Sequence, residues 1–428
     1  MFMYLSPVQS IIALGGVGGY MVFAYYDLKK ALIALCAALP LYIVEIQPVH
    51  HFILNALELL IFAIFLAALT RQDMRAALRR ALGKLRTIGV VVIVLALWDV
   101  MGILISHHFA LVHSMVWWGV VFVEPILLAI MLMSVVVDKN DERRIMQALF
   151  WSSVGVALGA LIFQYEIVGG HVVRLQFFYT SPNYLAMVLV PAGGIGAYLW
   201  STSARGSTKN AALILYGAAE VVLWGTIFLT ESYGAIVGAV AGALVAAAFW
   251  YVRHPQQHRS LAPWIMGGIV VFSVFMISQA HSQKIAELLG TSGRSSLEYR
   301  GMIWYAVWNM VAHHPFFGVG VGNFAYAIPP FLPQGFGPVP HANNVYLELL
   351  AEQGIGGAAL FLLLSKRILS RIQYITGPFG ELAVFYFISL TVWGLVDTVY
   401  FKNDLAATFW IFAALTLIAA ERKPKKID

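Results

Sequence analysis

Long runs of apolar residues are the feature that most limits how this chain can fold. Many of them extend for about 20 residues with few charged side chains, which is the length that an α-helix needs to cross a bilayer. Hydrophobic residues make up 60% of the 428 residues and charged residues only 11%, more apolar surface than a water-soluble domain can bury. The sequence therefore predicts an all-α fold, a polytopic bundle of transmembrane helices.

The runs predict about twelve or thirteen membrane spans. The first is expected to be retained, because it has neither a basic start nor a small-residue cleavage site. About ten spans should form an N-terminal bundle over residues 1–280, followed by one large loop over 281–344 and a last group of spans with a basic tail over 345–428. The spans are predicted near residues 8–26, 31–46, 52–69, 88–105, 115–137, 146–164, 182–200, 211–230, 232–251, 263–280, 345–364, 380–397 and 404–420.

The distribution of basic residues predicts which loops lie on the same side of the membrane. Lysine and arginine accumulate in cytoplasmic loops, and here every second loop is basic, as is the C-terminal tail. This asymmetry accounts for the net charge of +6 without any nucleic-acid partner. The long loop over 281–344 then lies outside. The basic residues that depart from the pattern and fall on the outer side are Arg174, Lys284, Arg294, Arg300 and Lys402.

Within the long loop, the sequence around Arg300 predicts a helix. The segment Ser295-Ser296-Leu297-Glu298 has the spacing of a capping box, and the helix should end before Pro315. An amphipathic helix at the membrane–water interface is expected, with Arg300 placed to bind phosphate oxygens through its planar guanidinium. The residues predicted to share its interfacial face are Arg300, Trp304, Val307, Trp308 and Val311.

The segment that follows this helix predicts two turns and the start of a further span. Residues 318–323 are rich in glycine but lack the surroundings of a nucleotide-binding loop, so a tight backbone turn is expected. Residues 329–340 contain too much proline and glycine for a helix and are predicted to form a covering flap. Asn343 or Asn344 should cap the next helix, which places His341 just before a helix N-terminus and Glu348 on its first turns.

In combination these stretches resemble the signature loop of the O-antigen ligase and O-antigen polymerase superfamily. The close likeness covers roughly residues 290–360, and it is carried by Arg300-x-x-x-Trp304, by the run from Pro315 to Phe324 and by the run from Pro340 to Gly357. A looser likeness lies upstream, where Arg174 precedes the helix start Asn183-Tyr184-Leu185-Ala186.

The resemblance implies a membrane glycosyltransferase of surface-polysaccharide biosynthesis, such as that of lipopolysaccharide or exopolysaccharide. Such an enzyme moves a glycan from undecaprenyl diphosphate to a sugar hydroxyl at the periplasmic face of the bacterial inner membrane, without a metal or cofactor. The acceptor is lipid A–core in the ligases and another repeat unit in the polymerases. Membrane lipids and polysaccharide-assembly proteins are the other expected partners, and the C-terminus is expected in the cytoplasm.

The resemblance also implies roles for individual residues. A leaving diphosphate gains negative charge, so arginines aimed at it stabilise the transition state, and the acceptor hydroxyl needs a base. Arg300 and Arg174 are expected to hold the diphosphate with help from Arg294, and His341 is the expected base. The residues expected to support this site are Asn343, Asn344, Glu348, Trp304 and Tyr233.

Two positions depart from the family pattern and keep several functions open. Tyr233 stands where the family has an arginine, and Asn343 stands where the ligases have a histidine, with His341 as its upstream neighbour. A ligase, a repeat-unit polymerase and an inactive scaffold therefore remain alternatives. A polysaccharide transporter is a further alternative, although the chain has no internal repeat of the kind that many transporters show.

Other titratable residues have structural explanations, although the carboxylates inside the spans could equally line a proton or substrate path. His107, His108 and His113 are expected at the membrane interface rather than around a metal, because their spacing defines no common face. A carboxylate inside a span needs a polar partner or a water-filled cavity. This requirement applies to Glu58, Asp99, Glu124 and Glu220.

Overall fold

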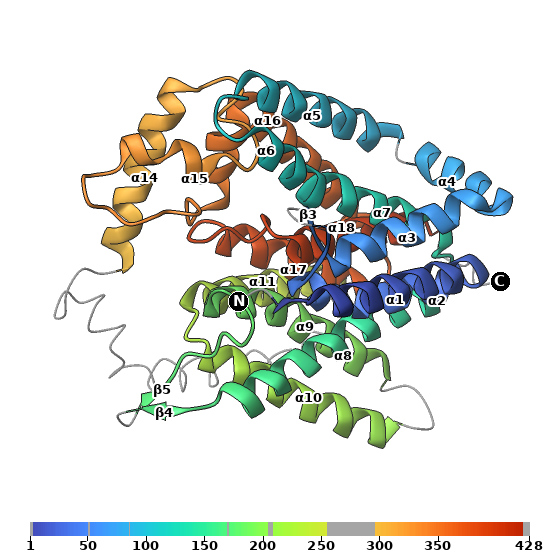
Figure 1. Ribbon diagram of the computed structural model, residues 1–428. Coiled ribbons are helices and arrows are strands. Elements are labelled where there is room, and N and C mark those ends of the chain that lie inside the picture. The colour runs from blue at the N-terminus through green and yellow to red at the C-terminus, as the bar shows by residue number, and fades with distance from the viewer. Residues whose placement is uncertain are drawn as a thin grey trace.

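A computed structural model describes residues 3–49, 52–84, 86–168, 171–203, 209–254 and 296–422. The described chain is mostly helical (Figure 1). Its first helices are α1 (Pro7–Tyr26), α2 (Leu28–Ala37), α3 (Ala56–Thr70), α4 (Gln72–Lys84), α5 (Arg86–Ile105), α6 (Leu111–Trp118), α7 (Glu124–Val135), α8 (Lys139–Gln164) and α9 (Pro182–Ser203). The remaining helices are α10 (Lys209–Leu229), α11 (Tyr233–Arg253), α14 (Ser296–His313), α15 (Phe324–Ala327), α16 (Val345–Leu369), α17 (Phe379–Trp393) and α18 (Asn403–Glu421).

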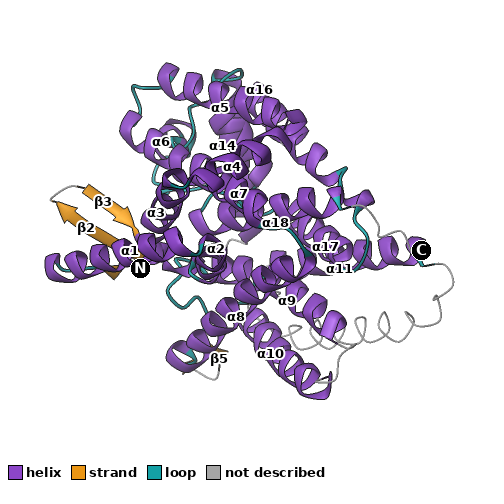
Figure 2. Ribbon diagram, turned by 90° about the vertical axis from the view of Figure 1, so that its right-hand side faces the viewer, coloured by secondary structure: helices purple, strands orange, loops and turns teal. Residues whose placement is uncertain are grey.

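Short strands form two small sheets at the margin of the helices. β1 (Met3–Tyr4) pairs in parallel with β2 (Val44–Val49), which pairs antiparallel with β3 (Phe52–Asn55). β4 (Ile167–Val168) and β5 (His171–Val172) form an antiparallel pair between α8 and α9. Figure 2 shows β2 and β3 as a hairpin at the edge of the helical assembly, beside α1.

The lengths and composition of the helices make this chain a polytopic all-α membrane protein, as predicted. Within the described ranges, nine helices are long and apolar enough to cross a membrane, and α3 and α17 are shorter apolar helices. The prediction of a span over 31–46 is wrong, because α2 has only 10 residues and ends at Ala37. Pro40, which has no N–H to continue a helix, then lies in a 3₁₀ turn that leads into β2. The span predicted near 263–280 lies outside the described residues.

The long helices run roughly side to side in Figure 1, so the molecule has two ends. We call them the α14 end, at the left with α15 and β4, and the α4 end, at the right with the end of α18. The basic segments gather at the α4 end. There Lys29 pairs with Asp141 at the start of α8, and Arg422 at the end of α18 bonds Glu142. Helix α18 connects the two ends through the core, where its residues from Leu405 to Ala419 are mostly buried.

The described part of the long loop, residues 296–344, has a hydrophobic core that it shares with the start of α16, and this corrects the predicted role of α14. Val307 is fully buried and Val311 is 7% exposed, and both pack with residues of the glycine turn, α15 and the start of α16. The predicted interfacial face of α14 therefore packs against protein, apart from Trp308, which is 56% exposed. The helix begins at Ser296 and ends at His313, before Pro315, as predicted. The loop is thus a folded unit built on α16.

The glycine-rich residues form a tight turn that replaces hydrogen bonds missing from a kink in α16. Gly354, inside α16, has φ +65° and ψ −174°, which breaks the helical hydrogen-bond pattern. The free N–H of Ile355 donates to the Pro315 carbonyl, at 2.9 Å. In return the Ala351 and Glu352 carbonyls accept from the N–H groups of residues 319 and 320, both at 2.9 Å. A Cβ on Gly354 would lie 2.0 Å from the Phe316 carbonyl oxygen, so the contact requires glycine.

Candidate functional site

His341 lies where the long loop meets the first turn of α16. Asn344 caps this helix, as predicted, and its side chain accepts from the N–H groups of Tyr346 and Leu347 at 3.0 and 3.1 Å. Glu348, buried one turn further on, accepts from the Ala342 N–H and lies 3.4 Å from Nδ1 of His341. A carboxylate only accepts hydrogen bonds, so the proton of a neutral His341 ring lies on Nδ1. Its Nε2 then carries the lone pair that a base needs.

Two predicted supporting residues fix the backbone around His341. Trp304, on α14, donates its indole N–H to the Ala342 carbonyl at 3.0 Å. Asn343 adopts a left-handed backbone with φ +51°, which asparagine tolerates better than most residues, and its amide reaches the His341 carbonyl at 3.5 Å. Helix α14 and the start of α16 thus hold His341 from two directions.

The loop between α17 and α18 brings a carboxylate close to His341 and Arg300. Asp397 accepts from the side-chain amide of Asn183, at the start of α9, at 2.6 Å. Burial raises the pKa of Asp397 above its ordinary value, and the charges of Arg300 and His341 act in the opposite direction. Coulomb effects of this kind fall off with distance, so Arg300, His341 and Asp397 share one neighbourhood.

Lys402, in the same loop, is connected to His341 through the ring of Tyr184. Its Nζ lies 3.7 Å from the ring centroid of Tyr184 and 3.3 Å from the Thr180 hydroxyl. The Tyr184 ring in turn meets the His341 ring edge to face, with centroids 6.3 Å apart. Burial lowers the pKa of Lys402 to about 8, although the charge of Asp404 opposes this shift. An ammonium group in such a position is suited to an anionic ligand.

Arg174 is held by the turn between α10 and α11. Its Nε donates to the Thr230 carbonyl at 3.0 Å and lies 3.8 Å from the Glu231 carboxylate, and its side chain is 37% exposed. This turn packs against the end of α17, since a Cβ on Gly234 would lie 2.8 Å from the Trp393 ring. Arg174 therefore lies at the side of the bundle where α17 leads into the Asp397 loop. Arg294 lies outside the described residues.

The stretch from α10 to α16 matches a known family. The family model described as O-antigen ligase covers residues 218–362, which include Tyr233, Arg300, the glycine turn, His341 and Glu348. Residues 218–362, about a third of the chain, therefore form an O-antigen ligase-like region. No curated protein matches it. As an O-antigen ligase-like protein it is a multi-pass membrane protein, and the family indicates a glycosyltransferase-type enzyme that uses a lipid-linked glycan and an acceptor.

Two cationic residues of the O-antigen ligase-like site lie outside the matched stretch. Arg174 was predicted from a looser likeness, whereas Lys402 was noted only as a basic residue on the outer side. Asp397, Asn183 and Tyr184 received no role from the sequence. The signal for Lys402 was present in the charge asymmetry of the loops, but its contact with Tyr184 joins two distant parts of the chain and becomes visible only in the fold.

Tyr233, predicted to stand where the family has an arginine, opens α11 directly after the turn that holds Arg174. The position of the missing arginine is therefore next to an arginine supplied by another segment of the chain. In the loop that follows α17, Lys402 adds a second cation that lies outside the family stretch. The candidate site thus has cationic side chains near the position of Tyr233 and in the α17–α18 loop.

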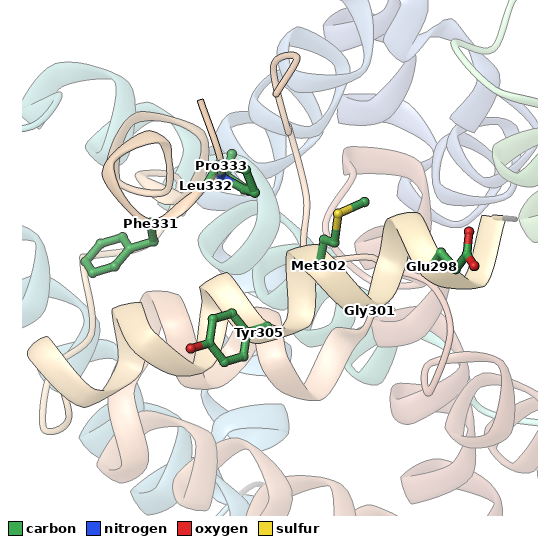
Figure 3. Close-up of a pocket in the computed structure, with 7 residues that line it drawn as sticks. All are labelled: Glu298, Gly301, Met302, Tyr305, Phe331, Leu332 and Pro333. Atoms are coloured by element: carbon green, nitrogen blue, oxygen red, sulfur yellow. The ribbon is translucent and has the colours of Figure 1, made fainter. Parts of the chain in front are cut away.

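An open groove follows the outer surface of α14 (Figure 3). It has a volume of about 760 Å³ and lies between α14 and the flap, with Tyr305 and Phe331 at one end and Glu298 at the other. Tyr305 is 72% exposed, and Gly301 leaves the middle of the helix surface open. The groove runs along the helix that also carries Trp304, which contacts the His341 segment.

Glu58, His107 and His113 make structural contacts away from the candidate site. Glu58 bonds Asn55 in a capping box and accepts from Asn403 at 3.3 Å, so it ties α3 to α18. His107 contacts the Leu104 carbonyl at 3.0 Å, and the His113 ring stacks on Trp117. In the ranges that the structure describes, no three His, Cys, Asp or Glu side chains are grouped to hold a metal ion.

Proposed function

We propose that this protein transfers a glycan from undecaprenyl diphosphate to a sugar hydroxyl of an acceptor. The reaction takes place at the α14 end, which we assign to the periplasmic side of the bacterial inner membrane. The α4 end, with its basic segments and the C-terminus, then faces the cytoplasm. The proposal is supported by the family match over residues 218–362 and by the gathering of His341, Arg300 and Lys402 at this end.

In the proposed reaction the acceptor oxygen attacks the anomeric carbon as the bond from that carbon to the diphosphate oxygen breaks. His341 accepts the hydroxyl proton on Nε2, while Glu348 holds its Nδ1–H. Arg300, Arg174 and Lys402 bind the departing diphosphate, with Arg294 as a further candidate. Cations fixed in place before the reaction stabilise the charge that develops on the leaving group. The groove beside Tyr305 is the proposed path of the acceptor glycan.

The observation that carries this proposal is the contact chain from Lys402 through Tyr184 and His341 to Glu348. It joins a cation suited to a phosphate, an aromatic ring, a base and the carboxylate that orients the base. A nucleophile that needs deprotonation and a leaving group that needs positive charge are the two demands of this glycan transfer. The contact chain supplies a group for each.

The proposal is tested with purified protein in vesicles that contain a lipid-linked glycan donor and an acceptor. We expect His341→Ala to lower the transfer rate by about 10²–10⁴-fold and Arg300→Ala by about 10²–10³-fold. The matched control is Arg79→Ala, an exposed arginine on α4 at the opposite end, which should leave the rate unchanged. Transfer at the normal rate in both site variants would refute the assignment of the site.

The same vesicle assay distinguishes the proposed enzyme from a transporter and from an inactive scaffold. A transporter would move the donor across the vesicle membrane without consuming it, and an inactive scaffold would do neither in the wild-type protein. We expect donor consumption that persists in the presence of a chelator. Loss of activity on removal of metal ions would contradict the reaction as written.

A repeat-unit polymerase is the second candidate function. It is favoured by Asn343, whose left-handed backbone and amide contact with the His341 carbonyl give it a structural part and no basic group. The glycan profile of a deletion strain distinguishes the two. Loss of a ligase leaves finished polymer on the carrier lipid, whereas loss of a polymerase leaves single-repeat products.

A further inference from the structure

A basic cavity lies at the α4 end, on the opposite side of the molecule from His341. It has a volume of about 200 Å³ and lies between the start of α8, the start of α17 and the end of α18. Three cationic side chains line it, namely Lys139, Arg143 and Arg422. Glu142 is the only carboxylate among the described residues that line it. The cavity therefore carries more positive than negative charge.

The acidic residues nearest to the cavity already have partners. Asp141 pairs with Lys29 at 2.9 Å, and Asp138 accepts from the N–H groups of residues 140 and 141 as the cap of α8. Glu142 is bonded by Arg422 and by the Tyr198 hydroxyl, the latter at 3.0 Å. These bonds occupy the three carboxylates, although the charge of Glu142 still acts on Lys139.

The positions of Lys139 and Arg143 are electrostatically unfavourable, and a bound anion would offset this repulsion. They stand four residues apart on one face of α8, where like charges repel, and they lie near its N-terminus, where the helix dipole disfavours cations. Arg143 donates to the neutral Ser203 hydroxyl at 2.6 Å. A Cβ on Gly377 would lie 3.8 Å from the Lys139 Nζ, so this lysine reaches across the cavity to the loop before α17.

A second cavity of about 650 Å³ adjoins the basic one, and Tyr198 and Pro378 line both. It runs between α9, α10, α11 and α17, from Ser201 to Gly193 along α9, a length of about 12 Å at the rise of a helix. Small residues such as Gly194 and Ala243 and the ring of Phe385 form much of its wall. Its depth approaches the thickness of one leaflet of a bilayer's hydrocarbon core, roughly 15 Å.

We propose that these two cavities bind one anionic phospholipid of the leaflet at the α4 end. The headgroup phosphate occupies the basic cavity beside Lys139 and Arg143, and one acyl chain lies in the adjoining groove. No lysine or arginine is among the described residues that line the groove, whereas three line the basic cavity, so the anionic group is expected in the basic cavity. Basic pockets between helices at a membrane surface recognise anionic headgroups in this way.

This proposal does not depend on the transfer reaction, because the two sites lie at opposite ends of the helices. It is tested on the full-length protein, purified and stripped of lipid, by native mass spectrometry with added phosphatidylglycerol or phosphatidylcholine of identical chains. We expect one phosphatidylglycerol to bind at least about tenfold more tightly than phosphatidylcholine. Equal affinity for the two lipids would overturn the proposal.

Variants test whether the lipid preference comes from the cavity or from the basic surface of the α4 end as a whole. Lys139→Gln with Arg143→Gln should reduce the preference for phosphatidylglycerol by about tenfold or more, whereas Arg143→Lys should keep most of it. The matched control removes two exposed charges from α4 as Arg79→Gln with Arg80→Gln, and its preference should be unchanged. An equal loss in the control would mean that the basic surface, not the cavity, selects the lipid.

Two further measurements test whether the bound phosphate belongs to a lipid and whether the acyl chain of that lipid lies in the groove. Inorganic phosphate at millimolar concentration should not displace the lipid, since the acyl chain supplies part of the binding. Displacement at that concentration would identify a site for a free anion. Ala243→Phe, which fills the groove, should weaken both lipids about equally and leave the headgroup preference intact. Unchanged affinity for both lipids would show that the acyl chain does not lie in the groove, and it would overturn that part of the proposal.

Discussion

At the scale of single residues, Lys402 has the most informative surroundings. It lies over the face of Tyr184, and burial lowers its pKa from 10.5 to about 8. A lysine of this kind is protonated at neutral pH but close enough to its pKa to lose the proton under mildly basic conditions. Arginine does not share this property, because its guanidinium stays protonated above pH 12. The difference between the two side chains makes the proposed role of Lys402 testable.

We predict that kcat/KM of the proposed transfer falls as the pH rises through about 8. The lowered pKa means that Lys402 binds the diphosphate as a cation below that pH and loses its charge above it. Lys402→Arg should abolish the fall on the basic side, and Lys402→Met should lower kcat/KM by about tenfold or more at neutral pH. The measurement is a pH–rate profile of each protein. If kcat/KM of Lys402→Arg still fell above about pH 8 as in the wild type, the fall would be due to another titratable group.

At this scale the sequence predicted the residues whose roles depend on their chain neighbours. Asn344 follows the loop and precedes an apolar run, so its role as a cap was readable, and His341 followed from the position of that cap. Asp397 and Asn183 were not predicted, because their hydrogen bond joins the α17–α18 loop to the start of α9. The sequence gives no sign of which two distant polar residues will meet.

At the scale of elements, the kink of α16 connects the glycine turn to the proposed site. The kink exposes the carbonyls of Ala351 and Glu352 to the turn, and the turn lies between α14 and α16. These helices carry Arg300 and Glu348. The sequence predicted the turn from its glycines, but it could not predict the kink, because Gly354 stands in an apolar helical segment that would also suit a straight span.

We predict that Gly354→Ala destabilises the protein. The backbone there has φ +65° and ψ −174°, a region that is essentially restricted to glycine, and the new Cβ would lie 2.0 Å from the Phe316 carbonyl oxygen. The strain alone should cost about 1–3 kcal/mol of unfolding free energy. The measurement is the unfolding temperature of the purified protein in detergent.

The matched control for this variant is Gly217→Ala. Gly217 lies in α10, and a Cβ there would have nothing within 4 Å, so alanine should be neutral or slightly stabilising. We therefore expect a lower unfolding temperature for Gly354→Ala and an equal or higher one for Gly217→Ala. If both variants unfolded at the wild-type temperature, the glycine turn would not depend on the kink.

At the scale of the molecule, the two ends differ in charge and in architecture. The α14 end carries a folded loop with a small core of its own, whereas the α4 end carries basic helices and the phospholipid site that we propose. The apolar runs and loop charges of the sequence predicted the helical class and this asymmetry well. They failed over residues 31–46, where apolar residues form a short helix and a strand instead of a span.

The assignment of the α14 end to the outside is tested by labelling introduced cysteines in whole cells. The natural Cys36 is fully buried, so it gives little background. Tyr305→Cys, at a position 72% exposed on α14, should react with a membrane-impermeant thiol reagent that reaches the periplasm. Arg79→Cys, on α4, should react only after the inner membrane is permeabilised. The reverse pattern would place the α14 end in the cytoplasm, where a periplasmic transfer reaction at His341 is impossible.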